Sequence, residues 1–272
     1  MSAPHPLPPG VRVVDSHCHL ADEAFDADRD AVWQRALDVG VAGAVIVGAG
    51  GGSASNQAAL ELVRRHPDRM RAVVGIHPHD AKDADRRALE EVARLARDPL
   101  VAAVGETGLD YHYDNSPREA QVASLRAHVL IAAEVGKPLV IHCRDAYADL
   151  FRVLDEDRPP RLRGVVHCFT GNLQEAQAML ELGFSISFSG IVTFRNANAL
   201  REVARVIPRD RLLVETDAPY LAPVPLRGKR CEPSFVVETA ARLAEVRGDD
   251  LAELCAAVTH NATAIFGLPA TH

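Results

Sequence analysis

The sequence lacks the features of a disulfide-stabilised or membrane-spanning protein. Its 272 residues include five cysteines, an odd number with no Cys-x-x-Cys pair. This argues against a disulfide framework or a zinc site built from cysteines, and it suits a reducing compartment. No segment approaches the ~18 uncharged apolar residues of a membrane span. Residues 1–10 have neither the charged nor the apolar region of a secretory signal. We therefore expect a cytoplasmic protein that makes no use of a membrane.

The chain also lacks an excess of positive charge. Its formal net charge is −7, so bulk electrostatics do not favour nucleic-acid binding, and any contact with phosphate groups has to be local or metal-mediated. Hydrophobic residues make up 47% and charged residues 25% of the chain, which is an ordinary globular balance. The length suits one large α/β domain.

Residues 1–10 are proline-rich and read as an irregular lead-in, whereas residues 11–268 form one domain with no change of composition inside it. In this domain, eight short runs rich in Val and Ile alternate with longer segments of helical periodicity. The runs show little polar alternation, which is typical of strands buried on both faces. We expect strands at 11–15, 42–48, 71–76, 101–106, 138–142, 164–167, 184–189 and 211–217. We expect helices at 26–39, 55–66, 83–97, 117–135, 145–156, 173–182, 197–206, 233–247 and 249–266.

This alternation predicts an α/β fold with a parallel sheet, and eight repeats favour a TIM-like (β/α)8 barrel in a single domain. An open doubly wound sheet is the competing layout. In barrels, the active site is built at the carboxyl ends of the strands. Candidate functional residues are therefore sought where the apolar runs end.

Six histidines and carboxylates stand at the ends of five of the runs. They are His17, His19, Glu106, His142, His167 and Asp217. Nitrogen and carboxylate ligands on rigid strands suit a divalent ion such as Zn²⁺, Mg²⁺, Mn²⁺, Fe²⁺ or Ni²⁺. Six ligands are more than one tetrahedral site needs, so we expect two divalent metal ions that share a carboxylate.

Two His-x-His sequences occur, and they differ in context. Residues i and i+2 of a strand point to one face, so His17 and His19 can both point into the barrel mouth while Cys18 points away. His77 and His79 are separated by Pro78 in a segment that has left its strand. For this second pair we favour positioning of the substrate, or support of the ligands, over direct metal binding.

Basic and aromatic residues follow the same strand ends. Arg144 comes two residues after His142, and the long loop after Asp217 carries a basic cluster. Long loops at a catalytic rim are often functional, so we expect this cluster to contact phosphate groups, with a solvated charge run as the alternative. Three rim tyrosines could stack on bases or cap the core. The basic cluster is Arg227, Lys229 and Arg230, and the tyrosines are Tyr111, Tyr113 and Tyr220.

Five motifs in fixed order resemble one family. They are DSHCHL, GETGLDY, HCRDA, HCFTG and ETDAPYL, and they resemble the TatD family of metal-dependent deoxyribonucleases in the amidohydrolase superfamily, from about Val11 to Leu268. The resemblance implies a TIM-like barrel and 3′–5′ DNA exonuclease or related phosphodiesterase activity, with a single-stranded end as substrate and no obligate protein partner. It places one metal with His17, His19, Glu106 and Asp217, and the other with Glu106, His142 and His167.

The sequence departs from the family pattern at positions outside these ligands, with Leu226, Cys231, Ala262 and Ala264 in place of the usual residues. No lysine ends the fourth run, so Glu106 takes the bridging position that a modified lysine fills elsewhere in the superfamily.

Three function classes compete. The first is a phosphodiesterase in which Asp217 binds metal and also accepts a proton from water. The second is hydrolysis of an amide or ester, such as removal of an aminoacyl group from tRNA. The third is a binding protein without activity, which the presence of all six ligands disfavours.

Overall fold

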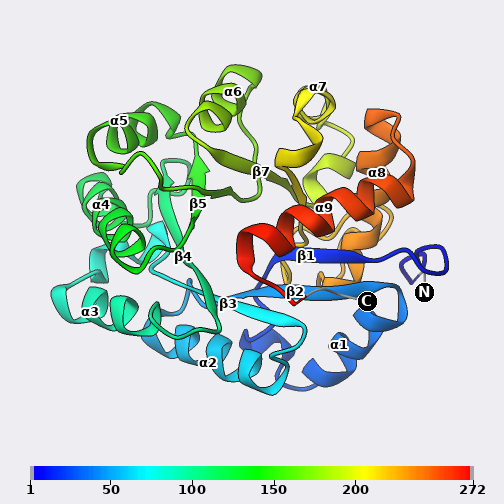
Figure 1. Cartoon of the computed structure of the whole chain (residues 1–272), viewed down its shortest axis with the longest axis horizontal. Coiled ribbons are helices and arrows are strands. Elements are labelled where there is room, and N and C mark those ends of the chain that lie inside the picture. The colour runs from blue at the N-terminus through cyan, green and yellow to red at the C-terminus, as the bar shows by residue number, and fades with distance from the viewer. Residues whose placement is uncertain (1–2, 270–272) are drawn as a thin grey trace.

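The structure, a computed structural model, describes residues 3–269 and is a barrel of strands surrounded by helices (Figure 1). The strands are β1 (Val13–Cys18), β2 (Val41–Val47), β3 (Met70–Val74), β4 (Val101–Asp110), β5 (Leu139–Arg144), β6 (Gly164–Val166), β7 (Phe184–Phe188) and β8 (Leu212–Val214). The helices are α1 (Arg29–Asp38), α2 (Gly52–Arg65), α3 (Arg86–Leu95), α4 (Arg118–Val135), α5 (Tyr147–Asp157), α6 (Leu173–Glu181), α7 (Asn198–Val206), α8 (Val236–Arg247) and α9 (Leu251–Phe266).

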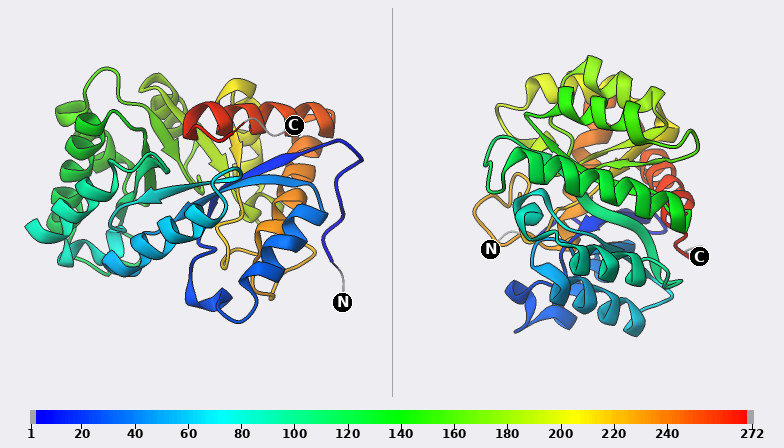
Figure 2. Two further views of the ribbon diagram at one scale, coloured as in Figure 1. Left: turned by 60° about the horizontal axis from the view of Figure 1, so that its bottom comes forward. Right: turned by 90° about the vertical axis from the view of Figure 1, so that its left-hand side faces the viewer.

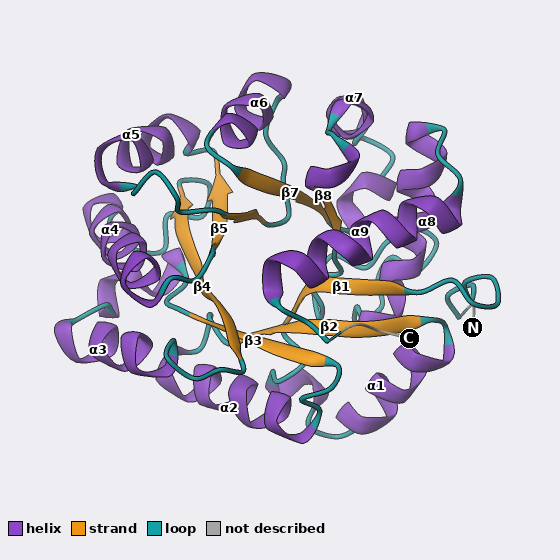
Figure 3. Cartoon of the chain, viewed as in Figure 1, coloured by secondary structure: helices purple, strands orange, loops and turns teal. Residues whose placement is uncertain are grey.

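The strands pair in sequence order from β1 to β8, and every pair is parallel. Helices α1 to α8 surround the strands, whereas α9 lies across them (Figures 2 and 3). The predicted TIM-like barrel is confirmed, and the doubly wound alternative is wrong because consecutive strands are neighbours throughout. Within residues 3–269, no helix is both long and apolar enough to cross a membrane.

Side chains and loop backbone close the seam between β8 and β1. The buried carboxylate of Asp15 accepts hydrogen bonds from the backbone N–H of Thr216 (3.0 Å) and from its hydroxyl (2.6 Å). The N–H of Asp217 donates to the carbonyl of His17 at 3.0 Å. These bonds hold the segment after β8 against β1, and they place Asp217 beside the first His-x-His sequence.

Apolar side chains fill the part of the barrel interior next to α9. There the strand residues pack against the end of α9, which crosses the barrel in Figure 1. This helix starts at Asp250, whose side chain accepts from two backbone N–H groups of the first turn, and it ends at Gly267 in the left-handed conformation. The interior cluster comprises Val14, Val45, Val47, Ala49, Val73, Ala103, Val140, Val165, Leu213, Ala262, Phe266 and Leu268.

The predicted helix boundaries agree with the structure to within three residues, but two strands differ in a way that affects the site. Strand β4 continues to Asp110, four residues beyond its predicted end at Glu106. Strand β8 ends at Val214, so Asp217 lies beyond the strand. Asp217 itself adopts a φ of +58°, outside the extended conformation of a strand.

Candidate metal centre

The side chains of His17 and His19 lie together at the carboxyl end of β1. Their Nε2 atoms are 3.3 Å apart. Between them in sequence, Cys18 is buried with its thiol directed at the Val45 carbonyl of β2, 3.6 Å away. The alternation of a strand thus separates two ligand-type side chains from an apolar one, as the sequence pattern predicts.

Glu106 from β4 and Asp217 from the loop after β8 complete a first donor group with these two histidines. Glu106 Oε2 is 3.4 Å from His17 Nε2 and 3.7 Å from His19 Nε2. Asp217 Oδ1 is 3.7 Å and 3.6 Å from the same two atoms. In a tetrahedral site with ligand bonds of about 2.0–2.2 Å, neighbouring donors lie about 3.3–3.6 Å apart. The four atoms therefore fit one divalent ion.

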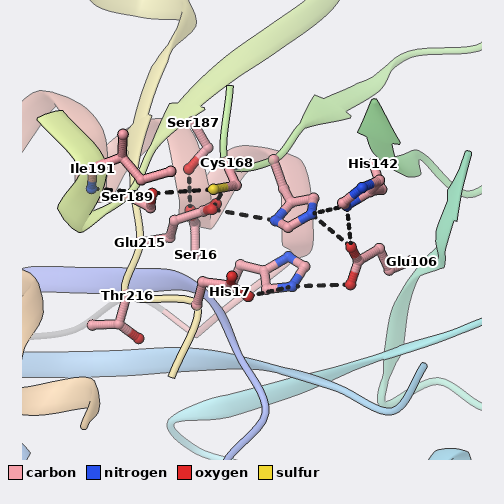
Figure 4. Close-up of polar contacts among 12 residues, drawn as sticks. Ser16, His17, Glu106, His142, Cys168, Ser187, Ser189, Ile191, Glu215 and Thr216 are labelled. Atoms are coloured by element: carbon pink, nitrogen blue, oxygen red, sulfur yellow. Dashed lines mark hydrogen bonds and ion pairs between the residues drawn. The ribbon is translucent and has the colours of Figure 1, made fainter. Parts of the chain in front are cut away.

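The other oxygen of Glu106 faces a second donor group. Glu106 Oε1 lies 3.1 Å from His142 Nδ1 and 2.6 Å from His167 Nε2, and these two nitrogens are 3.3 Å apart (Figure 4). His77 Nε2 is also 3.3 Å from Glu106 Oε1. This differs from our expectation for His77, which the structure brings among the donor atoms. One carboxylate thus presents one oxygen to each group.

Asp110, at the end of β4, supports the second group and escaped the sequence analysis. Its Oδ2 lies 3.0 Å from His142 Nε2 and 3.0 Å from His79 Nε2. The contact leaves the Nδ1 atom of His142 to face Glu106. His79 stays outside the donor groups and pairs with Asp110. The signal was the spacing: Asp110 follows Glu106 by four residues on one strand, and alternate residues share a face.

Glu215 is a second buried carboxylate that the sequence analysis missed. It is fully buried, and its Oε1 lies 3.3 Å from His167 Nδ1 (Figure 4). Its position two residues before Asp217 was the available signal.

Both carboxylates of the first donor group stay ionised. Burial acts to raise the pKa of Glu106, but the imidazoles of His167 and His77 outweigh burial and hold that pKa well below its ordinary value. Burial likewise acts to raise the pKa of Asp217, but the hydrogen bond with His19 and the nearby imidazoles of His167 and His17 together lower that pKa below its ordinary value. Two buried anions that remain charged require cations beside them.

The histidines respond to the same surroundings in opposite directions. Burial lowers the pKa of His17, which favours the neutral, metal-binding form. Burial also acts on His167, but Glu106 and Glu215 outweigh it and raise the pKa of this ring well above its ordinary value. A metal ion at the second group would compete with that proton. The donor set therefore fits divalent cations chemically as well as by distance.

The centre is closed on the side of His17 and Glu106 and open on the side of His19, Asp217 and His142. The side chains of the closed side are 1% and 3% exposed, whereas those of the open side are 13–18% exposed. The side chains that a ligand could reach are therefore those of His19, Asp217 and His142.

The rim tyrosines divide into two kinds. Tyr113 and Tyr220 are 58% and 57% exposed, and their rings lie edge-on to His79 and His19 at 5.5 Å and 6.2 Å. Tyr111 instead donates its hydroxyl proton to Asp149 at 2.7 Å. Two tyrosines on opposite sides of the donor groups thus remain accessible to a ligand.

The predicted basic cluster also divides. Arg227 and Lys229 are exposed, and the Arg227 guanidinium lies over the ring of Phe194 at 4.0 Å. Arg230 is half-buried and forms ion pairs with Asp28 at 2.8 Å and Glu232 at 3.3 Å.

The ion pairs of Arg230 hold the loop after β8 against the segment that precedes α1 and carries Asp28. At the opposite side of the rim, Arg144 places its guanidinium 4.9 Å from the centre of the Tyr113 ring. A cation and an accessible aromatic ring therefore lie together near the second donor group.

Comparison with known proteins identifies the family of this chain. The family described as "TatD related DNase" matches residues 14–267. The chain belongs to the TatD family. It is thus a member of a family of metal-dependent hydrolases, as the motif order predicts.

TatD-family relatives match along nearly their whole length. The chain is 39% identical to the uncharacterized metal-dependent hydrolase YabD of Bacillus subtilis, covering 93% of this chain and 98% of that protein. It is 39% identical to the 3′-5′ ssDNA/RNA exonuclease TatD of Erwinia amylovora, covering 93% and 99%. The crystal structure of the TatD homologue YjjV of Escherichia coli superposes with a TM-score of 0.87 at 30% identity, covering 95% and 99%.

Proposed function

We propose that this TatD-family chain is a two-metal phosphodiesterase that removes nucleotides from the 3′ end of a single nucleic-acid strand. The observation that carries the proposal is the placement of Glu106, whose two oxygens face two separate donor groups. The polarity and the substrate come from the name of the Erwinia relative.

One ion would be held by His17, His19, Glu106 and Asp217, and the other by Glu106, His142 and His167, with His77 beside it. Two divalent ions supply Lewis-acid stabilisation of the charge that develops on a phosphoryl group. Their identity is left open by ligands of this kind, which suit zinc, magnesium, manganese, iron and nickel in different degrees.

Asp217 is the residue that we assign to proton transfer. It is ionised, it lies on the open side, and only one of its oxygens, Oδ1, is directed at the histidines. It can therefore accept a proton from the attacking water while it holds its place in the first donor group.

The rim would hold the strand on either side of the scissile phosphate. Tyr113 and Tyr220 offer exposed rings on which bases can stack. Arg144 lies near the second donor group and would pair with a neighbouring phosphate, while Arg227 and Lys229 would contact phosphates further along the strand. Such local contacts would offset the repulsion between DNA and a chain of net charge −7.

The test is hydrolysis of matched substrates by the metal-loaded protein. A single-stranded oligonucleotide labelled at its 5′ end should yield a ladder that shortens from the 3′ end, and blocking the 3′ end should slow it. A chelator should abolish the reaction, and a divalent ion should restore it. Full activity in the chelator contradicts the proposal. Turnover of an aminoacyl ester without any oligonucleotide cleavage would instead support the amide or ester alternative.

A further inference from the structure

The imidazole rings of His17 and His167 stack, although they belong to different donor groups. Their centroids are 3.9 Å apart and their planes are inclined by 13°. Both rings direct Nε2 to the same carboxylate, since His17 Nε2 is 3.4 Å from Glu106 Oε2 and His167 Nε2 is 2.6 Å from Glu106 Oε1. Two parallel rings that turn Nε2 toward Glu106 turn their Nδ1 edges away from it.

Glu215 lies against the Nδ1 edge of His167 and comes within 4.8 Å of His17. Its Oε1 accepts a hydrogen bond from the backbone N–H of Cys168 at 2.7 Å and lies 3.3 Å from His167 Nδ1. One donor-type atom from each of His17, His167 and Glu215 falls within 4.8 Å of the others. The two stacked rings therefore lie between two glutamates, with Glu106 on one edge and Glu215 on the other.

Two atoms at this place lack a hydrogen-bond partner within residues 3–269, and they complement each other. They are Nδ1 of His17 and Oε2 of Glu215, and both are buried. A buried donor and a buried carboxylate oxygen are each costly when unpaired. A contact between these two atoms would satisfy both, and it would complete a carboxylate that already holds His167 through its other oxygen.

A histidine that binds metal through one ring nitrogen usually gives the other N–H to a carboxylate, which fixes the tautomer and the orientation of the ring. We propose that Glu215 is a positioning residue shared by both metal positions: its carboxylate accepts the Nδ1–H of His17 and of His167, so that both rings present an unprotonated Nε2 beside Glu106. This inference rests on the two-metal centre proposed above.

A shared support has a consequence that separate supports would not have. An ion at either position fixes the orientation of Glu215 and of one stacked ring. The histidine at the other position is oriented by the same carboxylate. Asp110 provides the contrast, because of the metal-group histidines it contacts His142 alone. Loss of Glu215 should therefore weaken both positions, whereas loss of the Asp110 charge should weaken one.

The experiment titrates metal-free wild-type protein, Glu215→Gln and Asp110→Asn with Zn²⁺ by calorimetry, in competition with a chelator of known affinity. The glutamine side chain keeps the volume of Glu215, but its NH₂ group cannot accept the second Nδ1–H. In Glu215→Gln, both binding steps should weaken by about 10–100-fold. In Asp110→Asn, one step should weaken by that amount and the other should stay within about twofold of wild type.

Wild-type affinity at both positions of Glu215→Gln overturns the inference, and so does weakening at one position. If the wild-type chain binds two ions in these titrations, the proposed two-metal function is unaffected by either result. If the wild-type chain binds no ion, both the shared role of Glu215 and the proposed function are overturned. If Glu215→Gln does not fold, ¹⁵N spectra of the zinc-loaded wild-type protein decide. Both His17 and His167 should carry the proton on Nδ1, and an unprotonated Nδ1 of His17 overturns the inference.

Discussion

The two ends of the barrel interior have opposite chemistry, although the same strands build both. Strand β1 contributes Val14 to the apolar cluster at the amino end and His17 to the donor groups at the carboxyl end. Strand β4 does the same with Ala103 and Glu106. At the amino end, Phe266 of α9 fills the interior. The carboxyl end instead gathers buried charges.

Along each strand, the apolar residues therefore contribute mainly to the stability of the fold, and the polar residues at the carboxyl end contribute mainly to metal binding. Apolar burial at the amino end stabilises the fold by roughly 25 cal/mol per Å². Buried carboxylates and histidines at the carboxyl end cost stability when no cation compensates them. The comparison predicts that changes at the carboxyl end alter metal binding and activity, whereas changes at the amino end alter the free energy of unfolding.

The largest effect is expected for Glu106→Ala. This change removes a donor from both groups, so both ions should be lost together. Activity should fall by more than the ~10⁴-fold upper range for loss of one general base. Elemental analysis and an oligonucleotide assay measure the two quantities. Retention of two ions per chain would contradict the bridging position of Glu106.

A smaller loss is expected for Asp217→Asn, because asparagine keeps an oxygen donor and loses the basic carboxylate. Turnover should fall by about 10²–10⁴-fold, while much of the metal stays bound. The check is kcat beside metal content in the same preparation. Near wild-type turnover would remove the assigned role of Asp217 in proton transfer.

At the amino end, Phe266→Ala should lower the free energy of unfolding by about 3–5 kcal/mol, because it opens a cavity in the barrel interior. Metal content should stay at the wild-type value. Chemical denaturation measures the stability, and Val206→Ala on the exposed surface of α7 is the control, expected within about 0.5 kcal/mol of wild type. Loss of metal in folded Phe266→Ala would show that the two ends are not separable.

The pH dependence of the free energy of unfolding should show the titration of His128, a fully buried histidine of α4. Its Nε2 accepts the N–H of Ile76 at 3.0 Å, and burial lowers its pKa to about 4. In the unfolded chain, His128 binds a proton below about pH 6.5. The folded state resists this protonation, so His128 has no effect on the free energy of unfolding above pH 6.5 and lowers it as the pH falls from 6.5 toward 4.

Protonation of His128 should lower the free energy of unfolding by about 3 kcal/mol at pH 4, relative to pH 7. Denaturation of metal-free protein between pH 7 and pH 4 tests it, with His128→Gln as the comparison because glutamine does not titrate. The wild-type slope should exceed the variant slope, since every other titrating group is common to both proteins. Equal slopes would rule out the contribution of His128.

The smallest effect is expected at the rim loop. Replacing Arg227 and Lys229 by Ala should raise KM for an oligonucleotide. The slope of log KM against log salt concentration should also fall, by about 0.7 for each phosphate contact that is lost. Arg230→Ala is the matched control, because its ion pairs with Asp28 and Glu232 should make it affect stability rather than KM. If Arg230→Ala changes KM as much as the double variant, the division of the cluster is wrong.

Local sequence patterns predict the strands, the helices and six of the residues that the structure gathers at the donor groups. Buried parallel strands have a local signature, since both faces are apolar, and helices repeat every 3.6 residues. The same pattern places the strand ends to within about four residues. Because these ends meet at one side of any parallel barrel, His17, Glu106 and His142 could be expected together without knowledge of a single contact.

The tertiary structure alone decided which partner each side chain finds. Glu215 contacts His167 across 48 residues, and Asp110 contacts His142 across 32. Such pairs depend on the register and tilt of neighbouring strands, which periodicity does not encode. The same holds for Arg230. It lies in a basic segment of the sequence, but its side chain is paired with the carboxylate of Asp28, 202 residues away. Local pattern fixes the face of an element, whereas contact between elements is fixed by how the whole barrel closes.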